Sequence, residues 1–260
     1  MFKRLKKPLK KILRKPFNST KKKQLIVHCS HHRSGTTWFL GVLSDVANYF
    51  ALNITSGDQI ELRNDTDIFF QQHSIVDAKK LPQYRGTHMI RDPRDLVVSS
   101  YFYHKWTKEK WAHIPKKEFG NKTYQQYLNS VSQEDGIVTE MNRIVNWEVK
   151  YMLEWEYDNP NFLEIKYENI IFNQDQIFNK IFRHYGFNDK AIRASQKIAK
   201  RHNFENKTNR KLGEIKDRSH LRSGLKGQWE KVFIDKHKVY FKELLGDSLI
   251  KLGYENNYDW

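Results

Sequence analysis

The 260-residue sequence has a single cysteine, Cys29, and no apolar run close to the length of a membrane span. One cysteine excludes an intrachain disulfide and is compatible with a reducing compartment. A membrane-spanning helix needs about 20 consecutive apolar residues. The basic start of the chain is not followed by the apolar core of a signal peptide either. We therefore expect a cytoplasmic location.

Acidic residues are missing from the first 23 positions, which hold eleven Lys or Arg. The net charge of +16 therefore belongs mostly to this segment, and only about +5 remains for the rest. Its apolar residues fall near helical spacing, which would suit peripheral contact with an anionic membrane. Pro8 and Pro16 interrupt that pattern, and charge runs are more often solvated. We expect residues 1–23 to be a basic, flexible arm and residues 24–260 to form one folded domain.

The stretch QLIVHCSHHRSGTTWFLGVLSDVANYF, residues 24–50, changes character twice. Residues 24–29 carry a short apolar, β-branched run, residues 30–35 are small and polar, and apolar residues then return at spacings of three and four. This pattern predicts a strand, a tight loop and a helix. Such a loop directs backbone N–H groups and the positive end of the helix to one point, where a phosphate can be held. An ordinary, well-capped turn is the alternative.

The nucleotide P-loop G-x-x-x-x-G-K-[ST] is missing, because its first Gly is absent and Thr36 stands where the Lys belongs. The loop resembles instead the 5′-phosphosulfate loop of sulfotransferases that use 3′-phosphoadenosine 5′-phosphosulfate (PAPS), whose pattern is close to P-K-S-G-T-T-W. SGTTW matches from Ser34 to Trp38, and Arg33 replaces the usual Lys. The resemblance implies a catalytic role for Arg33. It also implies that six residues bind the cofactor: Arg33, Ser34, Gly35, Thr36, Thr37 and Trp38.

A short strand is predicted over 68–71, just before His73. A lone His is usually structural. In the sulfotransferases that this chain resembles, however, a His at this place, often within K-T-H, is the general base. The resemblance implies that His73 takes the proton of an acceptor hydroxyl, which an imidazole with a pKa of about 6.5 can do at neutral pH. Gln71 stands where that motif has its Lys.

Another strand is predicted over 86–90, followed at once by RDPRDLVVSSYFYH. Asp92 suits an N-cap, Pro93 suits the first helical turn, and Asp95 falls at the capping-box position, so a helix begins here. We expect this helix start to be a second anion site, although good capping alone would explain the residues from 92 to 95.

Arg91 and Ser99 flank that helix start and match the motif R-[ND]-P-[RK]-D-x-x-V-S of the sulfotransferases. The resemblance implies that both bind the 3′-phosphate of PAPS, Arg91 as a planar, permanently charged fork and Ser99 as a hydroxyl donor. Ser99 is also assigned to the catalytic group with His73 and Arg33.

Three further elements resemble the family in the expected order. Tyr167 opens a Y-E-N sequence after a predicted strand over 162–166, and the resemblance places it near the adenine. It also implies that Phe204 stacks on the adenine opposite Trp38. The sequence RSGLKGQW matches R-x-G-x-x-G-x-W, in which Gly permits close backbone approach and Arg supplies charge. Three residues of this element are assigned to the cofactor: Arg222, Ser223 and Gly224.

Less regular segments complete the chain. Residues 104–135 show no strong periodicity, and their aromatic side chains suit either acceptor binding or packing. Amphipathic helices are predicted over 140–155, 173–185 and 191–202, and a final helix over 235–252.

The alternation of strands and helices predicts an α/β domain with a mainly parallel sheet, helices on both faces and a ligand at the carboxyl ends of the strands. The resemblance implies a P-loop-like sulfotransferase architecture. We expect sulfuryl transfer from PAPS to an acceptor hydroxyl, with a carbohydrate or small molecule favoured. No metal is expected, because the His spacing suggests no ligand set, and no nucleic acid, because no basic stripe with interleaved aromatics occurs. A nucleotide-dependent kinase and a non-catalytic, anion-binding family member are the alternatives.

Overall fold

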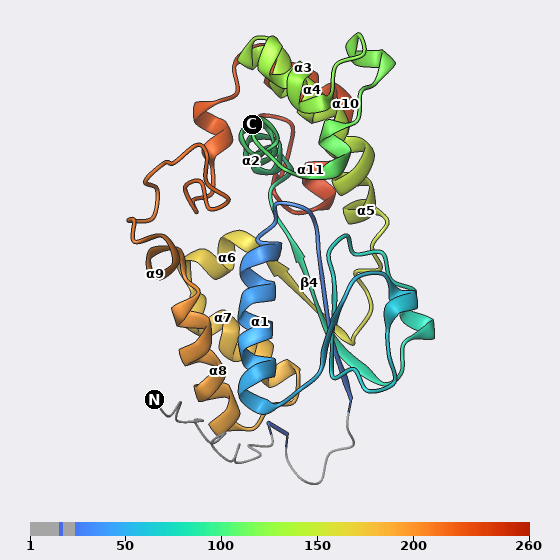
Figure 1. Ribbon diagram of the computed structural model, residues 1–260, viewed down its shortest axis with the longest axis vertical. Coiled ribbons are helices and arrows are strands. Elements are labelled where there is room, and N and C mark those ends of the chain that lie inside the picture. The colour runs from blue at the N-terminus through green and yellow to red at the C-terminus, as the bar shows by residue number, and fades with distance from the viewer. Residues whose placement is uncertain (1–15, 18–23) are drawn as a thin grey trace, which may run out of the picture.

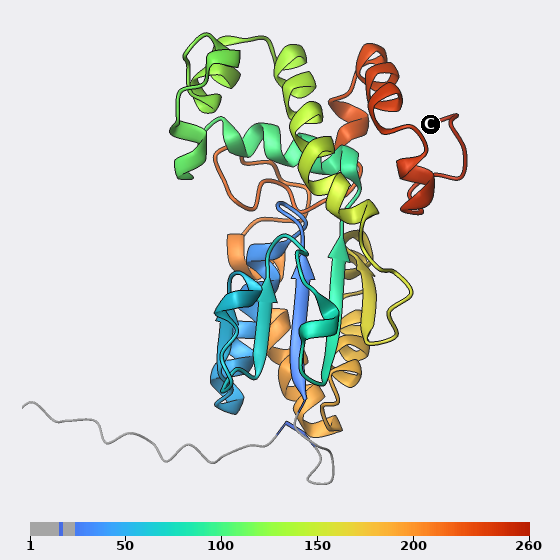
Figure 2. The same cartoon turned by 90° about the vertical axis from the view of Figure 1, so that its right-hand side faces the viewer.

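A five-stranded, fully parallel sheet forms the centre of the structure, in the order β2-β3-β1-β4-β5 (Figures 1 and 2). The structure is a computed structural model and describes residues 16–17 and 24–260. Four of the five strands were predicted from the sequence, with their ends correct to within two residues. β2 was not predicted, because it is short and partly exposed and has no apolar pattern. The strands are β1 (Leu25–Ser30), β2 (Ile54–Ser56), β3 (Ile68–Gln71), β4 (Tyr84–Ile90) and β5 (Phe162–Lys166).

β1 lies in the middle of the sheet, and all its residues are buried. His28, for example, pairs with Phe70 of β3 on one side and with Thr87 of β4 on the other. The strands that follow β1 in the chain, β2 and β3, lie on one side of it in the sheet, whereas β4 and β5 lie on the other side. The strand order therefore reverses direction between β1 and β4. A crevice for ligands opens at the carboxyl ends of strands at such a point.

Different structures cover the two faces of the sheet. The longer helices α1 (Thr36–Phe50), α7 (Gln174–His184) and α8 (Asp189–Arg201) pack on one face through a large apolar cluster. The segment 57–83 and Trp155 cover the other face. That segment contains the short 3-10 helices η1 (Gln59–Glu61) and η2 (Ala78–Lys80), so the expected helices on this second face are only single turns.

A layer of helices lies beyond the carboxyl ends of the strands, where the arrowheads in Figure 2 point. Its apolar cluster is separate from those of the sheet. The predicted helix 140–155 is part of this layer, but it begins earlier and contains a π-helical turn, while the final helix is interrupted near Gly246. The layer contains α2 (Pro93–His104), α3 (Tyr124–Ser130), α4 (Gln133–Ile144), η5 (Val145–Val149), α5 (Lys150–Leu153), α10 (Asp235–Leu245) and α11 (Ser248–Lys251).

Short elements connect the sheet to this layer. α6 (Tyr167–Phe172) follows β5, and α9 (Phe204–Thr208) follows α8. The 3-10 helices η3 (Lys110–His113) and η4 (Lys117–Phe119) follow α2, and η6 (Gln228–Lys231) precedes α10.

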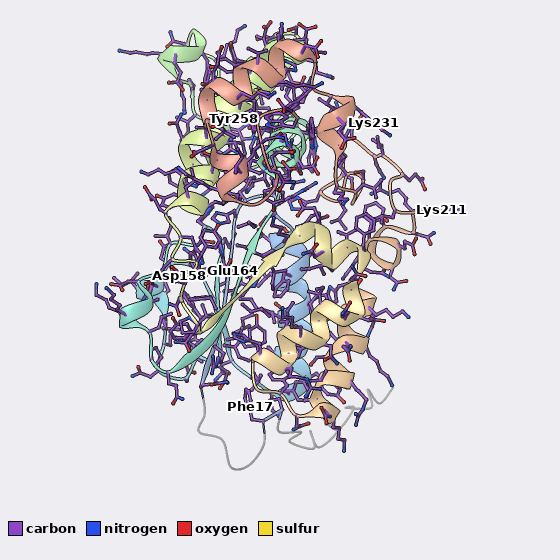
Figure 3. All side chains as sticks on the ribbon, turned by 180° about the vertical axis from the view of Figure 1, so that it is seen from behind. Phe17, Asp158, Glu164, Lys211, Lys231 and Tyr258 are labelled. Carbon is purple, nitrogen blue, oxygen red and sulfur yellow. The ribbon has the colours of Figure 1, made fainter. Side chains whose placement is uncertain are left out.

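The expected basic arm, residues 1–23, lies outside the described residues except for Pro16 and Phe17. These two pack on the domain: the Asn188 amide donates to the Pro16 carbonyl at 2.8 Å, and the Phe17 ring contacts Phe187 edge-on. Figure 3 shows Phe17 at the end of the sheet opposite the helical layer. In the parts of the chain that the structure describes, every helix is too short or too polar to cross a bilayer.

Candidate functional site

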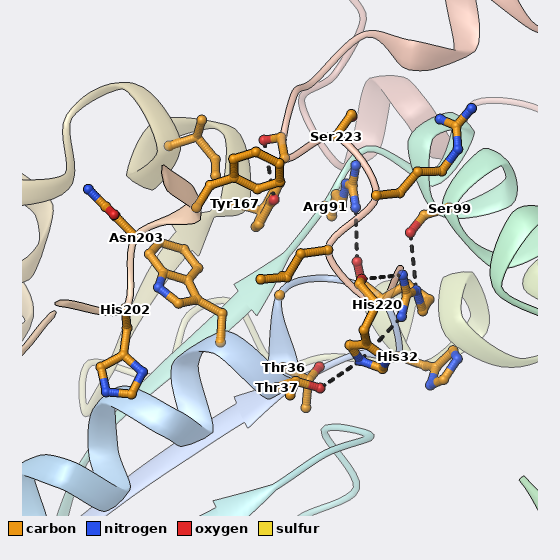
Figure 4. Close-up of a pocket in the computed structure, with 18 of the residues that line it drawn as sticks. His32, Thr36, Thr37, Arg91, Ser99, Tyr167, His202, Asn203, His220 and Ser223 are labelled. Atoms are coloured by element: carbon orange, nitrogen blue, oxygen red, sulfur yellow. Dashed lines mark hydrogen bonds between the residues drawn. The ribbon is translucent and has the colours of Figure 1, made fainter. Parts of the chain in front are cut away.

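A cavity of about 370 Å³ lies at the carboxyl ends of β1, β3 and β4 (Figure 4). Every residue that the sequence assigned to catalysis or cofactor binding lines it, except Ser34. Figure 4 shows Tyr167 and Asn203 on one side of the cavity and Ser99, His220 and His32 on the other. The fold thus brings residues from six segments of the chain to one site. The predicted residues at the cavity are Arg33, Gly35, Thr36, Thr37, Trp38, His73, Arg91, Ser99, Tyr167, Phe204, Arg222, Ser223 and Gly224.

Ser34 is buried and shapes the β1–α1 loop from inside. Its hydroxyl donates to the His31 carbonyl at 2.6 Å and accepts from the His31 amide at 3.0 Å. The Thr36 hydroxyl also donates to that carbonyl, at 2.8 Å. Ser34 therefore contributes to the site through the loop that it holds and does not face the cavity.

The start of α1 is open. Arg33 and Gly35 adopt positive φ angles of 65° and 95°, which fold the loop tightly before the helix. A Cβ atom at Gly35 would lie 2.9 Å from the Tyr167 ring, so only glycine fits there. No side chain of the described residues caps α1, and its first turn contains no acidic residue. The first N–H groups of the helix and its positive end are therefore available to an anion.

Arg33 is a half-buried cation that donates to neutral groups. Its Nε donates to the Ser99 hydroxyl at 3.1 Å, and its Nη2 donates to the His220 carbonyl at 3.0 Å. The guanidinium also lies over the Tyr103 ring at 4.3 Å. Burial, and secondly the charge of Arg91, lower the pKa of Arg33 to about 10. Arg33 therefore remains charged at neutral pH, close to the open helix start.

The start of α2 is closed by carboxylates. The Asp92 side chain accepts from the Arg94 amide at 2.9 Å, as an N-cap. The Asp92 amide in turn donates to the Glu168 carboxylate at 2.9 Å. The expected second anion site at a helix start is therefore wrong, because acidic side chains already take up these N–H groups.

Asp95 does not complete the expected capping box. Its carboxylate instead accepts from the amides of Gly227 and Trp229, at 2.7 and 3.1 Å. Asp95 thereby connects α2 to the turn that follows the R-x-G-x-x-G element, and it also faces Arg91 at 3.8 Å. Its function is to hold that turn against the helix.

Arg91 reaches the cavity from the end of β4. Its Nη1 donates to the Arg33 carbonyl at 3.1 Å and its Nη2 donates to the Leu225 carbonyl at 3.3 Å. The guanidinium lies over the Tyr167 ring at 4.6 Å. Its buried Nε has no hydrogen-bond partner among the described residues. A buried donor without a partner is costly, so Arg91 is suited to an anionic ligand.

Aromatic rings and a glycine turn form the other side of the cavity. The Tyr167 hydroxyl donates to the Gly224 carbonyl at 3.4 Å. Gly224 has a φ of 72°, and a Cβ atom there would lie 2.6 Å from the Phe204 ring. Trp38 meets Tyr167 edge-on. Together these contacts leave the rings of Trp38 and Phe204 along the cavity wall.

Arg222 lies beside that turn and is only partly compensated. Its Nε donates to the Asp217 carboxylate at 2.9 Å, but the Asp217 side chain is exposed to water. Its Nη1 donates to the Gln228 side chain at 2.6 Å, and its guanidinium lies over the Phe102 ring. An ion pair exposed to water is weak, so a phosphate can replace Asp217 as the partner.

His73 stands at the end of β3. Gln71, which replaces the Lys of the resembled motif, accepts from the His73 amide at 2.6 Å and from the Ile75 amide at 3.2 Å, and so holds the turn. His73 is partly buried, its Nδ1 has no partner among the described residues, and burial lowers its pKa. The imidazole is therefore neutral at neutral pH and able to accept a proton.

The sequence analysis missed His220. Its Nε2 lies 2.9 Å from the Thr37 hydroxyl and 3.3 Å from Arg33 Nη1, directly over the loop. Burial, and secondly Arg33, lower its pKa to about 4. The signal was its position two residues before Arg222 in the matched element.

The segment 104–135 contributes a carboxylate, Glu109, to the cavity lining, while its aromatic residues pack elsewhere. Tyr124 is buried in the helical layer, and the Trp106 Nε1 donates to the Asp217 carbonyl. The open alternative between acceptor binding and packing is thus decided for packing in Tyr124.

The fold brings together three residues that the sequence spacing did not connect. His32, His104 and Glu109 come from the β1–α1 loop, the end of α2 and the following loop, and their possible ligand atoms all lie within 4.8 Å of one another. The expectation of no metal was based on spacing along the chain and did not take this cluster into account.

Comparison with known proteins gives one family and several similar structures. Residues 23–253 match the family described as "Sulfotransferase domain". The crystal structure of the mouse sulfotransferase SULT7A1 complexed with PAP is 20% identical, with a TM-score of 0.59 over 88% of this chain and 84% of that chain. A retinol dehydratase in complex with androsterone and the inactive cofactor PAP is 17% identical, with a TM-score of 0.57 over 90% and 83%. No curated protein sequence matches the chain.

Proposed function

The chain belongs to the sulfotransferase family, and on this premise we propose that it transfers a sulfuryl group from PAPS to an acceptor hydroxyl. The proposal is based mainly on the cationic side chains and backbone N–H donors that surround one cavity. Arg91 is buried there and Arg33 is half-buried, and both have neutral acceptors as their closest partners. They lie beside a helix start that no side chain of the described residues caps. A cavity of this kind is suited to a ligand with several anionic groups.

The arrangement supports one orientation of the cofactor. The 5′-phosphosulfate would lie on Arg33 and the first turn of α1, with the hydroxyls of Thr36 and Thr37. The 3′-phosphate would lie on Arg91, Ser99 and Arg222, beside the backbone of Ser223 and Gly224. The adenine would lie against the rings of Trp38 and Phe204, near Tyr167. All these residues line the same cavity.

Bound PAPS supplies an activated sulfuryl group whose leaving group is a bisphosphate. We assign to His73 the removal of the acceptor proton as the acceptor oxygen bonds to sulfur. The bridging sulfur–oxygen bond breaks, and negative charge accumulates on the leaving oxygen. Arg33 neutralises this charge and donates hydrogen bonds to the leaving oxygen. Ser99 orients the Arg33 side chain through its hydroxyl.

The acceptor side of the cavity supports a hydroxyl-bearing small molecule. His32, Gln72, His73 and Glu109 line it and provide several polar groups. Groups of this kind suit the hydroxyls of a carbohydrate or similar compound better than an apolar ring system.

The experiment is transfer of sulfur-labelled sulfuryl from PAPS to a panel of saccharides, phenols and alcohols, with His73→Ala as the matched variant. We expect labelled product from at least one polyhydroxylated acceptor and a loss of about 10²–10⁴-fold in His73→Ala, the range for one general base. PAPS that binds without transfer to any acceptor would favour a non-catalytic member of the family. Equal rates in His73→Ala and the unchanged protein would remove His73 as the base.

A further inference from the structure

Two buried imidazole nitrogens beside the cavity have no assigned function. His32 Nε2 and His104 Nε2 are buried and have no hydrogen-bond partner among the described residues. The two rings are parallel, with centroids 5.5 Å apart. A carboxylate oxygen of Glu109 completes a group whose possible ligand atoms lie within 4.8 Å of one another. Buried polar atoms without partners are uncommon, and two beside one carboxylate indicate a missing ligand.

Neighbouring residues hold the group in place. His104 Nδ1 bonds to the Glu140 carboxylate at 2.5 Å, so Nε2 is its remaining nitrogen. The Glu109 carboxylate accepts from the Tyr103 hydroxyl at 2.8 Å and from Trp111 Nε1 at 2.6 Å. Each Glu109 oxygen still has a free lone pair. Carboxylate–histidine contacts and bonded carboxylates of this kind orient the ligands of metal ions in proteins.

We propose that His32, His104 and Glu109 bind a divalent metal ion of the zinc type. Two imidazole nitrogens and one carboxylate oxygen suit such an ion better than magnesium or calcium, which prefer oxygen ligands. Zinc–ligand distances of about 2.0–2.2 Å place tetrahedral ligands about 3.3–3.5 Å apart, so small side-chain rotations close the group. His32 and Glu109 also line the cavity, on the side proposed for the acceptor.

The surrounding charges permit a divalent cation. Arg143 lies near both imidazoles, but it is paired with Glu140 at 3.0 Å and with Glu148 at 3.1 Å. Arg33 is the second nearby cation. Against these two cations stand three carboxylates, those of Glu109, Glu140 and Glu148. The neighbouring side chains therefore present no net positive charge to a bound divalent cation.

The test uses full-length protein freed of metals with a chelator and titrated with Co²⁺ and, separately, with Zn²⁺ in competition with a coloured chelator. The variants are His32→Ala and Glu109→Gln, since loss of the fully buried His104 side chain could unfold the chain. The control is His113→Ala, because His113 lies in the same segment and bonds to the Thr107 carbonyl outside the cluster. Circular dichroism and bisphosphate binding in EDTA show that each variant is folded.

We expect one ion per chain in the unchanged protein and in His113→Ala, with the strong visible absorption of four-coordinate Co²⁺. His32→Ala and Glu109→Gln should bind Zn²⁺ at least about tenfold more weakly and lose that absorption. Equal binding by all four proteins would mean that surface histidines take up the ion. No stoichiometric binding would mean that a water molecule satisfies the two nitrogens. Either result would overturn the metal site and leave the proposed sulfuryl transfer untouched.

Discussion

Both strand-to-helix junctions at the centre of the sheet were expected to bind an anion, but they differ in the structure. At the β1–α1 junction, no side chain of the described residues caps the helix, and the half-buried Arg33 contacts a hydroxyl and a carbonyl group. At the β4–α2 junction, Asp92 caps the helix and Glu168 binds the Asp92 amide. The first junction is therefore prepared for an external anion, whereas the second is neutralised by the chain itself.

Arg91 and Arg94 belong to the same motif and show the difference between a ligand-binding and a structural cation most clearly. Arg94 is paired with Asp92 at 2.7 Å and with Glu255 at 2.5 Å, and its guanidinium lies over the rings of Trp229 and Trp260. Arg91 lines the cavity, and its Nε has no hydrogen-bond partner in the part of the chain that the structure describes. A buried cation with two acidic partners stabilises the fold, and a buried cation bonded mainly to neutral groups is suited to an anionic ligand.

The largest expected effect is on stability and concerns the β4–α2 junction. Arg94→Ala should lower the free energy of unfolding by about 3–5 kcal/mol, because it leaves the buried Asp92 and the largely buried Glu255 without their cation. Chemical denaturation measures this change. Bisphosphate affinity of the folded variant should stay within about threefold. A stable Arg94→Ala protein that no longer binds the bisphosphate would reverse the assignment of the two arginines.

The next largest expected effect is on turnover and concerns the β1–α1 junction. Arg33→Ala should lose at least about 10²-fold in turnover, the scale of losing one donor to a developing negative charge. Arg33→Lys is the matched variant, since Lys stands at this position in the resembled loop, and it should retain most of the activity. Turnover is measured as bisphosphate release with the acceptor that the panel identifies. Near-normal turnover in Arg33→Ala would show that the open helix start acts without this cation.

A pH profile tests whether His73 acts beside the open junction. Because burial lowers the pKa of His73, its neutral, proton-accepting form prevails at neutral pH and is lost only as the pH falls through a pKa below 6.5. The value of kcat/KM should therefore be flat near neutrality and fall about tenfold per pH unit below that point. Arg33 stays charged throughout this range. An acid limb centred above pH 7 would contradict the assignment.

The smallest expected effect concerns His220, whose Nε2 lies close to Thr37 and Arg33. An anion at the loop must take over these donors. His220→Ala should therefore bind the bisphosphate slightly more tightly, by about threefold, which corresponds to part of one hydrogen bond. Binding weakened more than about tenfold would mean that His220 contacts the cofactor and helps to hold it.

The sequence predicted the strands and the residues of the cavity because both depend on local patterns. Short runs rich in apolar residues mark β1, β3, β4 and β5, and short motifs define the loops at their ends. It could not predict which charges are already paired. Glu168 and Glu255 reach the β4–α2 junction from distant segments, and no motif links them to Asp92 or Arg94. The helix predicted over 140–155 begins earlier in the structure, at Gln133, because the Ser132 side chain caps it by accepting from the Asp135 amide.

The most direct test is calorimetric titration with 3′-phosphoadenosine 5′-phosphate in EDTA, applied to the unchanged protein, Arg91→Ala and Arg94→Ala, with ATP as the comparison ligand. We expect micromolar binding by the unchanged protein and by Arg94→Ala, and ATP at least tenfold weaker. Arg91→Ala should bind the bisphosphate at least about tenfold more weakly, because a charged hydrogen bond contributes about 1.5–3 kcal/mol. Preference for ATP, or equal bisphosphate binding by Arg91→Ala and the unchanged protein, would contradict a cofactor site built on the arginines that line the cavity.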